Sequence, residues 1–392
     1  MSTINPASGP LAGTVIVEMA AIGPVPHCGL VLAEMGAGVI RLDRIGAAEL
    51  GIPVPARHDA LARGKRSVAL DLKSQAGLDA ARALIARADV VIEGFRPGVM
   101  ERLGLGPDAC LAANPCLVYG RISGWGDAGP MARDSGHDLN YLGLTGALWA
   151  MGDPGTPPPV PLNLVADFGG GAMQLACGVL AALLSARATG RGQVVATSIL
   201  EGAAALTAMT HGFRAAGQWR DARRDNILDG GAPFYRTYAT ADGGYMAVAA
   251  IEQKFFQALL AGLGLQDAVT AASQLDRAGW PGMAHQFAER FAARTRDGWT
   301  ALFAGTDACV TPVLDWSEAQ AHPQMSALHM FGGPQGGLLP RTAPRFSVTA
   351  CATPATAVEP GADTRTVLLE IGMEPDAVDA ACRRLTLRDS PA

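Results

Sequence analysis

The first third of the chain alternates short apolar runs with segments of helical periodicity. β-branched residues concentrate in five runs, at residues 14–19, 38–43, 67–72, 89–95 and 116–123. Helical patterns lie between some of them, at residues 27–36 and 75–87. Strands that alternate with helices predict a parallel sheet with helices on both faces. We therefore expect an α/β fold with a large Rossmann-like domain, which binds its ligand beyond the carboxyl ends of the strands.

The pattern changes after residue 215, where the chain becomes polar and rich in glycine. Two alternating runs around a Gly-containing turn then predict a β-hairpin over residues 234–250. With 392 residues, the chain is longer than one core usually covers. The expected parts are a large α/β domain at 1–215, a linker at 216–232, a smaller α+β domain at 233–320 and a C-terminal segment at 321–392 that returns to the large domain.

Composition and charge disfavour several classes of protein. A formal net charge of −5 argues against nucleic acid as a partner, because phosphate binding needs a basic surface. The seven cysteines include no CxxC pair, which argues against a disulfide framework and favours a reducing compartment. The N-terminus lacks a signal-peptide pattern, and the longest apolar stretch, residues 172–186, is shorter than a membrane span and predicts a buried helix. We expect a cytoplasmic protein without a membrane partner.

The turn after the first strand lacks the glycine pattern of a dinucleotide site. Such sites use GxGxxG, whose glycines let the backbone approach a pyrophosphate. Here residues 20–29 read AAIGPVPHCG, and the two prolines in this stretch remove backbone donors. A nicotinamide or flavin cofactor is therefore not expected.

Residues 41–102 form a basic segment within an acidic chain, with eleven Lys or Arg residues against eight Asp or Glu residues. Two loops, at residues 62–67 and 95–98, are expected to place several of these cations within reach of a phosphorylated ligand. The composition fits an ordinary solvated surface equally well. Both interpretations stay open at this point.

Two residues are candidates for acid–base chemistry. His137 lies among glycines and polar residues, although a lone histidine is more often structural, and no second histidine lies at metal-ligand spacing. Asp167 precedes three glycines and a long apolar run, so it is predicted to be a helix N-cap. Capping does not explain the glycines, which cost about 0.8–1 kcal/mol each inside a helix. They indicate that another group approaches the backbone closely.

Glu252 follows directly after the second run of the predicted hairpin. It is either a charge at the start of the next helix or a carboxylate delivered to a site at the domain junction. The sequence does not decide between these roles. No metal site is expected, and no GxSxG motif supports a serine hydrolase.

Seven stretches resemble the family III CoA-transferases of the CaiB/BaiF type. They are VIVEMAAIGPVPHCGLVLAEMGAGVIRLDR, RGKRSVALDLK, EGFRPGVMERLGLGP, GHDLNYLGLTG, PLNLVADFGGG, GRGQVV and LDGGAPFYRTYATADGGYMAVAAIE. Within this family the chain is similar to the α-methylacyl-CoA racemase branch, because it has both His137 and Asp167. The transferases generally lack the histidine.

The resemblance implies an isomerase that racemises 2-methylacyl-CoA thioesters by 1,1-proton transfer at Cα through an enolate. His137 and Asp167 would be the acid/base groups on opposite faces of Cα. Asn163 and Glu252 match the residues that support the aspartate and the histidine. The glycine-rich helix start is expected to donate N–H groups to the enolate oxygen. Apolar neighbours are expected to raise the pKa of Asp167.

The resemblance also implies an acyl-CoA partner on the large domain and no separate cofactor, since CoA enters as part of the substrate. The expected contacts are Arg44, Leu70, Asp71, Leu72, Lys73, Arg96, Gly136, Asp138, Leu139, Asn140 and Tyr141. Family members form interlocked homodimers, so Glu252 is expected to reach His137 across the subunit boundary. Two alternatives are a CoA-transferase that uses Asp167 as a nucleophile through an aspartyl-CoA intermediate, and a non-catalytic acyl-CoA-binding protein.

Overall fold

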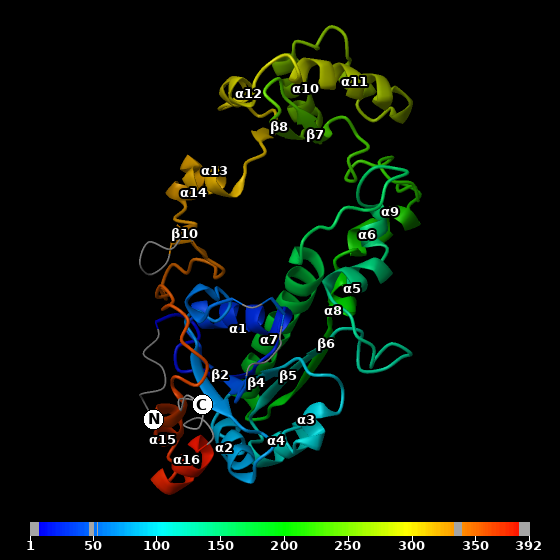
Figure 1. Ribbon diagram of the computed structural model, residues 1–392. Coiled ribbons are helices and arrows are strands. Elements are labelled where there is room, and N and C mark those ends of the chain that lie inside the picture. Colours follow the sequence, from blue (N-terminus) through cyan, green and yellow to red (C-terminus); the bar gives the residue numbers. More distant parts are fainter. Residues whose placement is uncertain (1–7, 47–50, 53, 333–338, 384–392) are drawn as a thin grey trace, which may run out of the picture. The chain divides into compact units, whose positions relative to one another are not determined.

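The computed structural model describes residues 8–46, 51–52, 54–332 and 339–383 (Figure 1). The chain divides into two compact units. The large unit comprises Met1–Thr145, Pro161–Leu206 and Ser326–Ala392, and the small unit comprises Gly146–Val160 and Thr207–Met325. Residues 146–160 therefore group with the small unit, which the sequence pattern does not indicate.

The large unit is built on a six-stranded parallel sheet. Its strands are β1 (Val15–Met19), β2 (Gly38–Arg44), β3 (Arg66–Leu70), β4 (Val90–Glu93), β5 (Val118–Ser123) and β6 (Gln193–Ser198). Their order is β3-β2-β1-β4-β5-β6, and all neighbours are parallel. This doubly wound order confirms the predicted Rossmann-like sheet. The order reverses between β1 and β4, which places the expected ligand crevice beyond the ends of these two strands.

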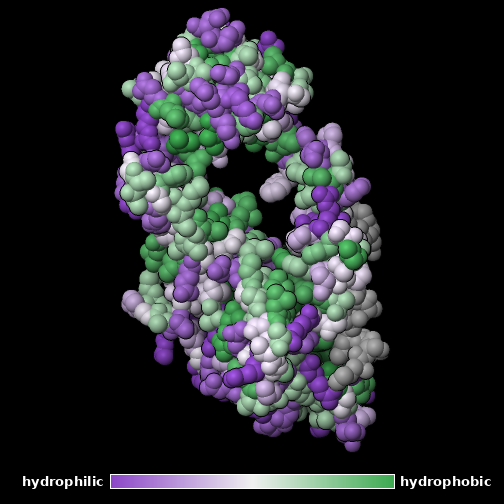
Figure 2. Space-filling model, turned by 180° about the vertical axis from the view of Figure 1, so that it is seen from behind, coloured by the Kyte–Doolittle hydropathy of each residue, from purple (hydrophilic) through white to green (hydrophobic). Residues whose placement is uncertain are grey.

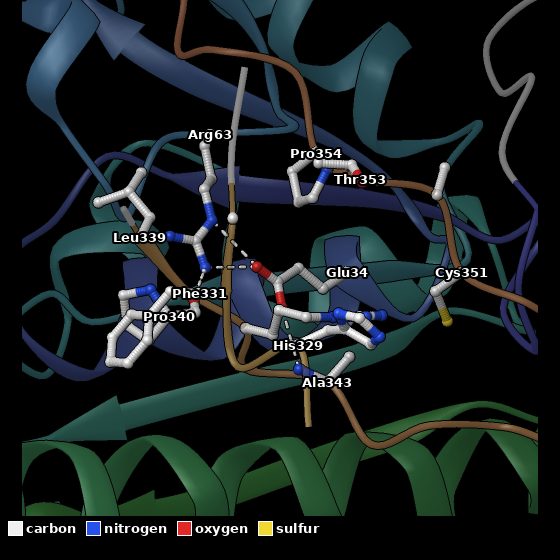
Figure 3. A pocket seen from close by; sticks show the side chains of 13 residues that line it. Glu34, Arg63, His329, Phe331, Leu339, Pro340, Ala343, Cys351, Thr353 and Pro354 are labelled. Carbon is white, nitrogen blue, oxygen red and sulfur yellow. Dashed lines mark hydrogen bonds and ion pairs between the residues drawn. The ribbon is translucent and has the colours of Figure 1, made fainter. Parts of the chain in front are cut away.

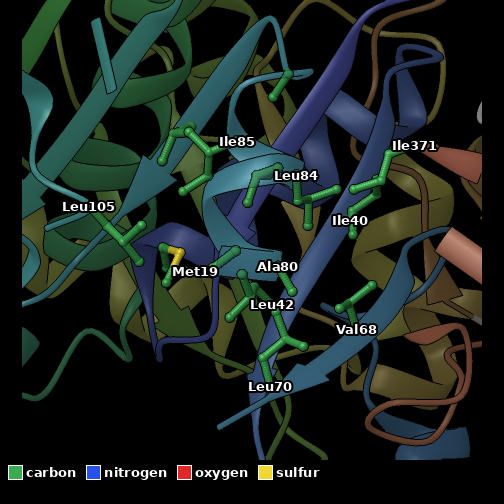
Figure 4. Packing of buried hydrophobic residues seen from close by; sticks show 14 of the residues in the cluster. Met19, Ile40, Leu42, Val68, Leu70, Ala80, Leu84, Ile85, Leu105 and Ile371 are labelled. Atoms are coloured by element: carbon green, nitrogen blue, oxygen red, sulfur yellow. The ribbon is translucent and has the colours of Figure 1, made fainter. Parts of the chain in front are cut away.

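Helices cover both faces of this sheet. On one face α1 (Pro24–Glu34) packs against α7 (Met173–Thr189). On the other face α2 (Gln75–Ile85) packs into the apolar cluster of Figure 4, where Ala80 and Leu84 lie over Ile40, Leu42 and Val68. The remaining elements before α7 are η1 (Ala56–His58), α3 (Val99–Arg102), α4 (Pro107–Ala113), α5 (Asp138–Leu144) and the π-helix η2 (Leu164–Ala172), and α8 (Ile199–Ala205) follows β6.

The C-terminal segment packs on the outer strand of the sheet. It contains β10 (Phe331–Gly332), β11 (Leu339–Pro340), α15 (Thr364–Glu370) and α16 (Pro375–Cys382). The backbone N–H of Ser67 in β3 donates to the carboxylate of Asp363 at 2.9 Å. Arg66 and Glu370 form an ion pair at 2.5 Å. These contacts attach the last two helices to β3.

The small unit contains a three-stranded antiparallel sheet in the order β7 (Tyr235–Ala239), β8 (Tyr245–Ala249) and β9 (Val310–Pro312). The pairing of β7 with β8 confirms the predicted hairpin. Its helical elements are α6 (Ala147–Ala150), α9 (Ala208–Ala215), α10 (Gln253–Leu263), η3 (Ala271–Ser273), η4 (Arg277–Gly279), α11 (Trp280–Phe291), α12 (Arg296–Phe303) and α13 (Trp316–Ala321). A short helix, α14 (Pro323–Ala327), contains the boundary to the large unit.

The long apolar helix is less buried than the sequence predicts. It runs over Leu164–Thr189 as η2 followed by α7, and its most apolar window is 44% buried. Leu184 is 71% exposed and Met173 is 40% exposed. By length and composition the helix is able to cross a membrane. Core helices of soluble proteins meet the same criteria of length and composition. Figure 2 shows apolar patches among polar side chains on the rear face of the molecule.

Candidate active site

Several predicted ligand contacts lie where strands of the large unit end. Arg44 is the last residue of β2, Leu70 is the last residue of β3, and Arg96 closely follows β4. Leu70 is 1% exposed and belongs to the core, so only its backbone can face a ligand. The next turn, residues 71–74, leads into α2, and the N–H of Lys73 donates to the Asp71 carboxylate at 3.0 Å. That these residues contact CoA stays a prediction.

Arg44 and Arg96 are oriented by neighbouring side chains. The guanidinium of Arg44 lies 5.8 Å from the ring centroid of Phe95. Nη2 of Arg96 donates to Oγ of Ser135 at 2.7 Å. Both arginines are exposed, as is Lys73. The carboxyl edge of the sheet therefore presents three cations of the basic segment to solvent.

Other cations of the basic segment are neutralised inside the large unit. Their ion pairs are Glu18–Lys65 at 2.6 Å, Glu34–Arg63 at 2.5 Å and Arg66–Glu370 at 2.5 Å. The Lys65 side chain is 1% exposed. The expectation that residues 62–67 offer these cations to a phosphorylated ligand is therefore wrong, because each already has a carboxylate partner.

His137 directly precedes α5 and is its N-cap by position. The side-chain oxygen of Asn140 accepts a hydrogen bond from the backbone N–H of His137 at 3.0 Å. In return, the backbone N–H of Asn140 donates to the His137 carbonyl at 2.8 Å. The histidine backbone is thus fixed while its side chain is exposed on the large unit, as a group that meets substrate must be.

The loop before His137 is held by Tyr141. The Tyr141 hydroxyl donates to the Gly136 carbonyl, and its ring meets Trp125 edge-on with centroids 4.7 Å apart. A Cβ atom on Gly136 would lie 2.7 Å from the Trp125 ring. Only glycine fits this position without a shift. In the same helix Leu139 is exposed.

Asp167 is not the N-cap that the sequence predicts. Asn163 precedes η2, so Asp167 is the fourth residue of the helix. Leu162, with a positive φ of 59°, forms the turn before it, and Leu164–Ala166 extend the apolar helix by one turn. A π-helix pairs each N–H with the carbonyl five residues earlier and often marks a functional site.

The three glycines after Asp167 serve helix packing. A Cβ on Gly170 would lie 2.5 Å from the backbone nitrogen of Ala203, and one on Gly202 would lie 2.1 Å from the Gly170 carbonyl oxygen. The backbones of η2 and α8 therefore touch here. Since the N–H groups of residues 169–171 pair within the π-helix, they do not provide the expected donors for an enolate oxygen.

The carboxyl group of Asp167 lies in a tight, partly buried environment. The first turn of α1 contacts it, because a Cβ on Gly23 would lie 2.9 Å from Asp167 Oδ2. The adjacent ring of Phe168 stacks on His27, with centroids 4.3 Å apart and planes inclined by 13°. Burial, together with the charge of Asp138, raises the pKa of Asp167 to about 6, and His137 opposes the rise. A carboxyl with this pKa gains and loses a proton near neutral pH.

Asp138 connects the two candidate acid–base groups. It follows His137, its side chain is buried, and its Oδ1 accepts a hydrogen bond from the backbone N–H of Asp167 at 2.7 Å. The carboxylate therefore ties the start of α5 to η2. The sequence gives Asp138 only as a ligand contact, because a bond between residues so far apart leaves no periodic signal.

Glu252 and Asn163 show no bond that supports the acid–base pair. Glu252 is the N-cap of α10 in the small unit, and its side chain is exposed and does not cap the helix. Asn163 is exposed before η2, and among the described residues it makes no side-chain capping bond. Their supporting roles stay predictions.

Sequence reasoning missed Gly23 and His27, both in the run GPVPH that opens α1. Prolines at positions 24 and 26 hide the helical periodicity there. Gly23 has a positive φ of 67°. A glycine directly before a helix can indicate such a backbone conformation, and this is the signal in the sequence that points to Gly23.

Neither a metal centre nor the cavity of Figure 3 coincides with this site. Within the described ranges, no group of three or more His, Cys, Asp or Glu residues is arranged to hold a metal ion. The cavity of Figure 3, about 260 Å³, lies between the end of α1 and the C-terminal segment. Its lining includes Glu34, Arg63 and Cys351 and none of the candidate site residues.

The parallel sheet, the cations at its carboxyl edge and the proximity of His137 and Asp167 agree with the comparisons with known proteins. The model of CoA-transferase family III matches residues 11–364, and the chain belongs to this family. It is 45% identical to the alpha-methylacyl-CoA racemase of Mus musculus and 42% identical to that of Homo sapiens. Each match covers 94% of this chain and 95% of the relative.

Other relatives are transferases or structures of the same fold. A succinyl-CoA–D-citramalate CoA-transferase of Chloroflexus aurantiacus is 33% identical over 67% of this chain and 66% of its own. A CaiB/BaiF family protein from Brucella suis has a TM-score of 0.77 at 27% identity, covering 93% of this chain and 100% of that one. The fold and the family thus agree.

Proposed function

We propose that this protein is an isomerase that racemises 2-methylacyl-CoA thioesters. Its similarity to two alpha-methylacyl-CoA racemases over 94% of the chain supports this. The structural observation that carries the proposal is the position of Asp167, which lies partly buried beside Gly23 and is bonded through its backbone N–H to Asp138, the residue after His137. Inversion at carbon needs one group that removes a proton from one face and a second that returns one to the other.

In this mechanism His137 and Asp167 exchange roles with direction. The base takes the Cα proton, and the C–H bond pair moves into the thioester to form an enolate. The opposite group then delivers a proton to the other face. Because the pKa of Asp167 is about 6, both its forms are accessible near neutral pH, as a carboxyl that alternates between acid and base requires.

The first turn of α5 is the best source of donors for the enolate oxygen. The helix begins directly after His137, and the first N–H groups of a helix have no carbonyl partner within it. The N–H groups of Asp138 and Leu139 therefore face the same end of the helix as the histidine. They replace the glycine N–H groups of η2 in this role.

The CoA moiety is proposed to bind at the carboxyl edge of the large sheet. Arg44, Lys73 and Arg96 are exposed there at the ends of three strands. Charge-assisted hydrogen bonds from arginine suit phosphate oxygens. No separate cofactor takes part, because the proton transfer uses only side chains and the thioester.

Asp138 is expected to serve Asp167 through its side-chain oxygen and through its charge. Asp138→Asn keeps an oxygen that accepts the Asp167 N–H, so kcat should stay within about threefold, while the acid limb of the pH profile moves to lower pH. Asp138→Ala removes the acceptor, so kcat should fall by about 10–100-fold. Steady-state kinetics of both variants checks this. Equal losses in both variants would contradict it.

The pH dependence of racemisation should follow the protonation of Asp167. For the stereoisomer that Asp167 deprotonates, kcat/KM falls on the acid side as this carboxyl becomes protonated. Since the pKa of Asp167 is about 6, the fall should begin near pH 6. Initial rates between about pH 4 and pH 9 measure this limb. Constant kcat/KM down to about pH 4 would show that the carboxyl in the reaction has an ordinary pKa, which contradicts this prediction.

We further propose that two copies form an interlocked homodimer in which Glu252 of one copy supports His137 of the other. The exposed apolar face of the Leu164–Thr189 helix supports a protein partner, since Leu184 is 71% exposed. The exposed Glu252 side chain, which does not cap α10, is free for such a role.

Co-expression of His137→Ala with Glu252→Ala tests this arrangement. In a mixed dimer one site carries both changes and the other carries none, so random assembly should restore about a quarter of the wild-type activity. His137→Ala with Asp167→Asn is the matched control, because both residues lie in the large unit. No activity beyond the control in the first mixture would place Glu252 and His137 in the same chain or apart.

The second candidate function is CoA transfer, which the 33% identical transferase relative supports. In that reaction the Asp167 carboxylate attacks the thioester carbonyl, the C–S bond breaks, and CoA leaves as the thiolate. Hydroxylamine should then trap the activated Asp167 carboxyl.

Incubating each pure 2-methylacyl-CoA stereoisomer alone decides the main proposal. The same mixture of stereoisomers from both supports racemisation, and no change in either contradicts it.

A further inference from the structure

A buried ion pair beneath α1 has no part in the proton transfer described above. Glu18 lies in β1, inside the sheet, and Lys65 directly precedes β3. The Nζ of Lys65 is 2.6 Å from Oε2 of Glu18, and the side chains are 1% and 0% exposed. Desolvation of two charges costs as much as their attraction returns, so stability alone does not explain such a pair.

The pair lies directly against the start of α1. Besides Glu18, Lys65 Nζ donates to the carbonyl of Pro26 at 2.8 Å. A Cβ on Gly29 would lie 1.7 Å from Glu18 Oε2 and 3.0 Å from Lys65 Nζ, so the helix backbone rests on the pair. Oε1 of Glu18 is buried and has no hydrogen-bond partner among the residues that the structure describes. The Glu18 carboxylate thus lies against the backbone of α1, although, within the described part of the chain, only one of its two oxygens is hydrogen-bonded.

The first turn of α1 combines buried apolar side chains with few backbone donors. Pro24 and Pro26 have no N–H groups, which leaves this turn with fewer backbone donors than an ordinary helix start. The bond from Lys65 to the Pro26 carbonyl is therefore an important attachment of this turn to the sheet.

This same turn is the surface on which Asp167 rests. The carboxyl of Asp167 fills the space beside Gly23, and Phe168 stacks on His27. A displacement of residues 23–27 would therefore move the carboxyl and the ring next to it.

We infer that the Glu18–Lys65 pair positions Asp167 by fixing residues 23–27 of α1 against the sheet. Both members are positioning residues, since neither reaches the carboxyl itself. The inference rests on the proposed function, because it concerns the acid–base group of that reaction.

The other end of α1 provides a matched control. Glu34 and Arg63 form a second buried ion pair on the same helix, with Nη2 of Arg63 at 2.5 Å from Oε1 of Glu34. Glu34 also accepts bonds from the N–H groups of Thr342 and Ala343 in the C-terminal segment. This pair lies far along the helix from Gly23 and touches no candidate site residue.

The test compares two double variants in the full-length protein. Glu18→Leu with Lys65→Met replaces the first pair by apolar side chains of similar length, a change that often leaves stability unchanged or increased. Its kcat for racemisation should fall about a hundredfold, as misplacing a catalytic group by about 1 Å does. The KM and the affinity for CoA itself, measured by calorimetry, should change less than about threefold, since the CoA contacts lie elsewhere. Glu34→Gln with Arg63→Met should keep kcat within about threefold.

Two further variants complete the test. Glu18→Gln keeps Lys65 on the Pro26 carbonyl and should retain kcat within about threefold. If the first double variant does not fold, His27→Leu removes the ring from Phe168 while the ion pair remains, and kcat should fall about tenfold at constant KM. The inference is overturned by any of three results. These are normal kcat in a folded Glu18→Leu, Lys65→Met protein, an equal loss of kcat in the Glu34 and Arg63 control, and unchanged kcat in His27→Leu. Each of these leaves the proposed function intact, which fails only if the wild type does not racemise.

Discussion

Asp167→Asn is expected to lower kcat/KM for racemisation by about 10²–10⁴-fold, the usual contribution of a general acid–base group. Asparagine has the shape of aspartate but neither gains nor loses a proton near neutral pH. The contacts with Gly23 and with the Asp138 side chain are compatible with the amide. The loss should therefore appear in kcat, while CoA binding is preserved. Loss of CoA binding in step with activity would point to a structural role instead.

The same substitution should stabilise the protein at pH 8. The pKa of Asp167 is raised in the folded state, so its carboxylate form is disfavoured by folding. The contribution of the neutral carboxyl is fully present below its unfolded pKa and is lost as the pH rises through about 6. The amide avoids this loss, and with allowance for partial exposure the gain is on the order of 1 kcal/mol. Thermal unfolding at pH 5 and pH 8 should show the increase at both pH values and a larger increase at pH 8, which also proves that the inactive variant is folded.

Gly23→Ala is expected to reduce kcat by about a hundredfold, because it displaces the carboxyl group of Asp167. The new Cβ would lie 2.9 Å from Asp167 Oδ2, so the carboxyl group has to shift, and 3.3 Å from its Cγ, which is a tight contact. The substitution also strains the backbone, since the φ of Gly23 is 67°. Steady-state kinetics with either stereoisomer measures the effect.

Gly13→Ala is the control for backbone strain. Gly13 also has a positive φ, 84°, and lies before β1, but a Cβ there would meet no atom within 4 Å. It should cost stability similar to that lost in Gly23→Ala and leave kcat unchanged. If both variants lose kcat equally, the contact between Gly23 and Asp167 does not position the carboxyl.

The sheet of the large unit was predictable because each strand carries its own signal. β-branched runs and intervening helical patterns predict βαβ units, and the right-handed crossovers of such units leave few possible strand orders. The hairpin over residues 234–250 was predictable for a similar reason, since alternation and a glycine turn are local features. The pairing of His137 with Asp167 came from the family resemblance, and the structure places both in the large unit.

What escaped the sequence depends on contacts between distant residues. The glycines at 169–171 indicate a close approach, but only the structure identifies the backbone of α8 as the approaching group. The N-cap prediction for Asp167 failed because a π-helix begins one turn earlier, and no periodicity distinguishes it from an α-helix. The cations at 62–67 were expected to be within reach of a ligand because their carboxylate partners, such as Glu18 and Glu34, come from segments far away in the chain.

The most direct test of two acid–base groups on opposite faces is Cα–H exchange in D₂O, measured from each pure stereoisomer of a 2-methylacyl-CoA. The wild type should exchange and invert both stereoisomers. Asp167→Asn should retain exchange only for the stereoisomer whose Cα–H faces His137, and His137→Gln only for the other, with inversion slowed by about 10²–10⁴-fold in either variant. Exchange of the same stereoisomer by both variants, or racemisation by Asp167→Asn at the wild-type rate, would contradict the account.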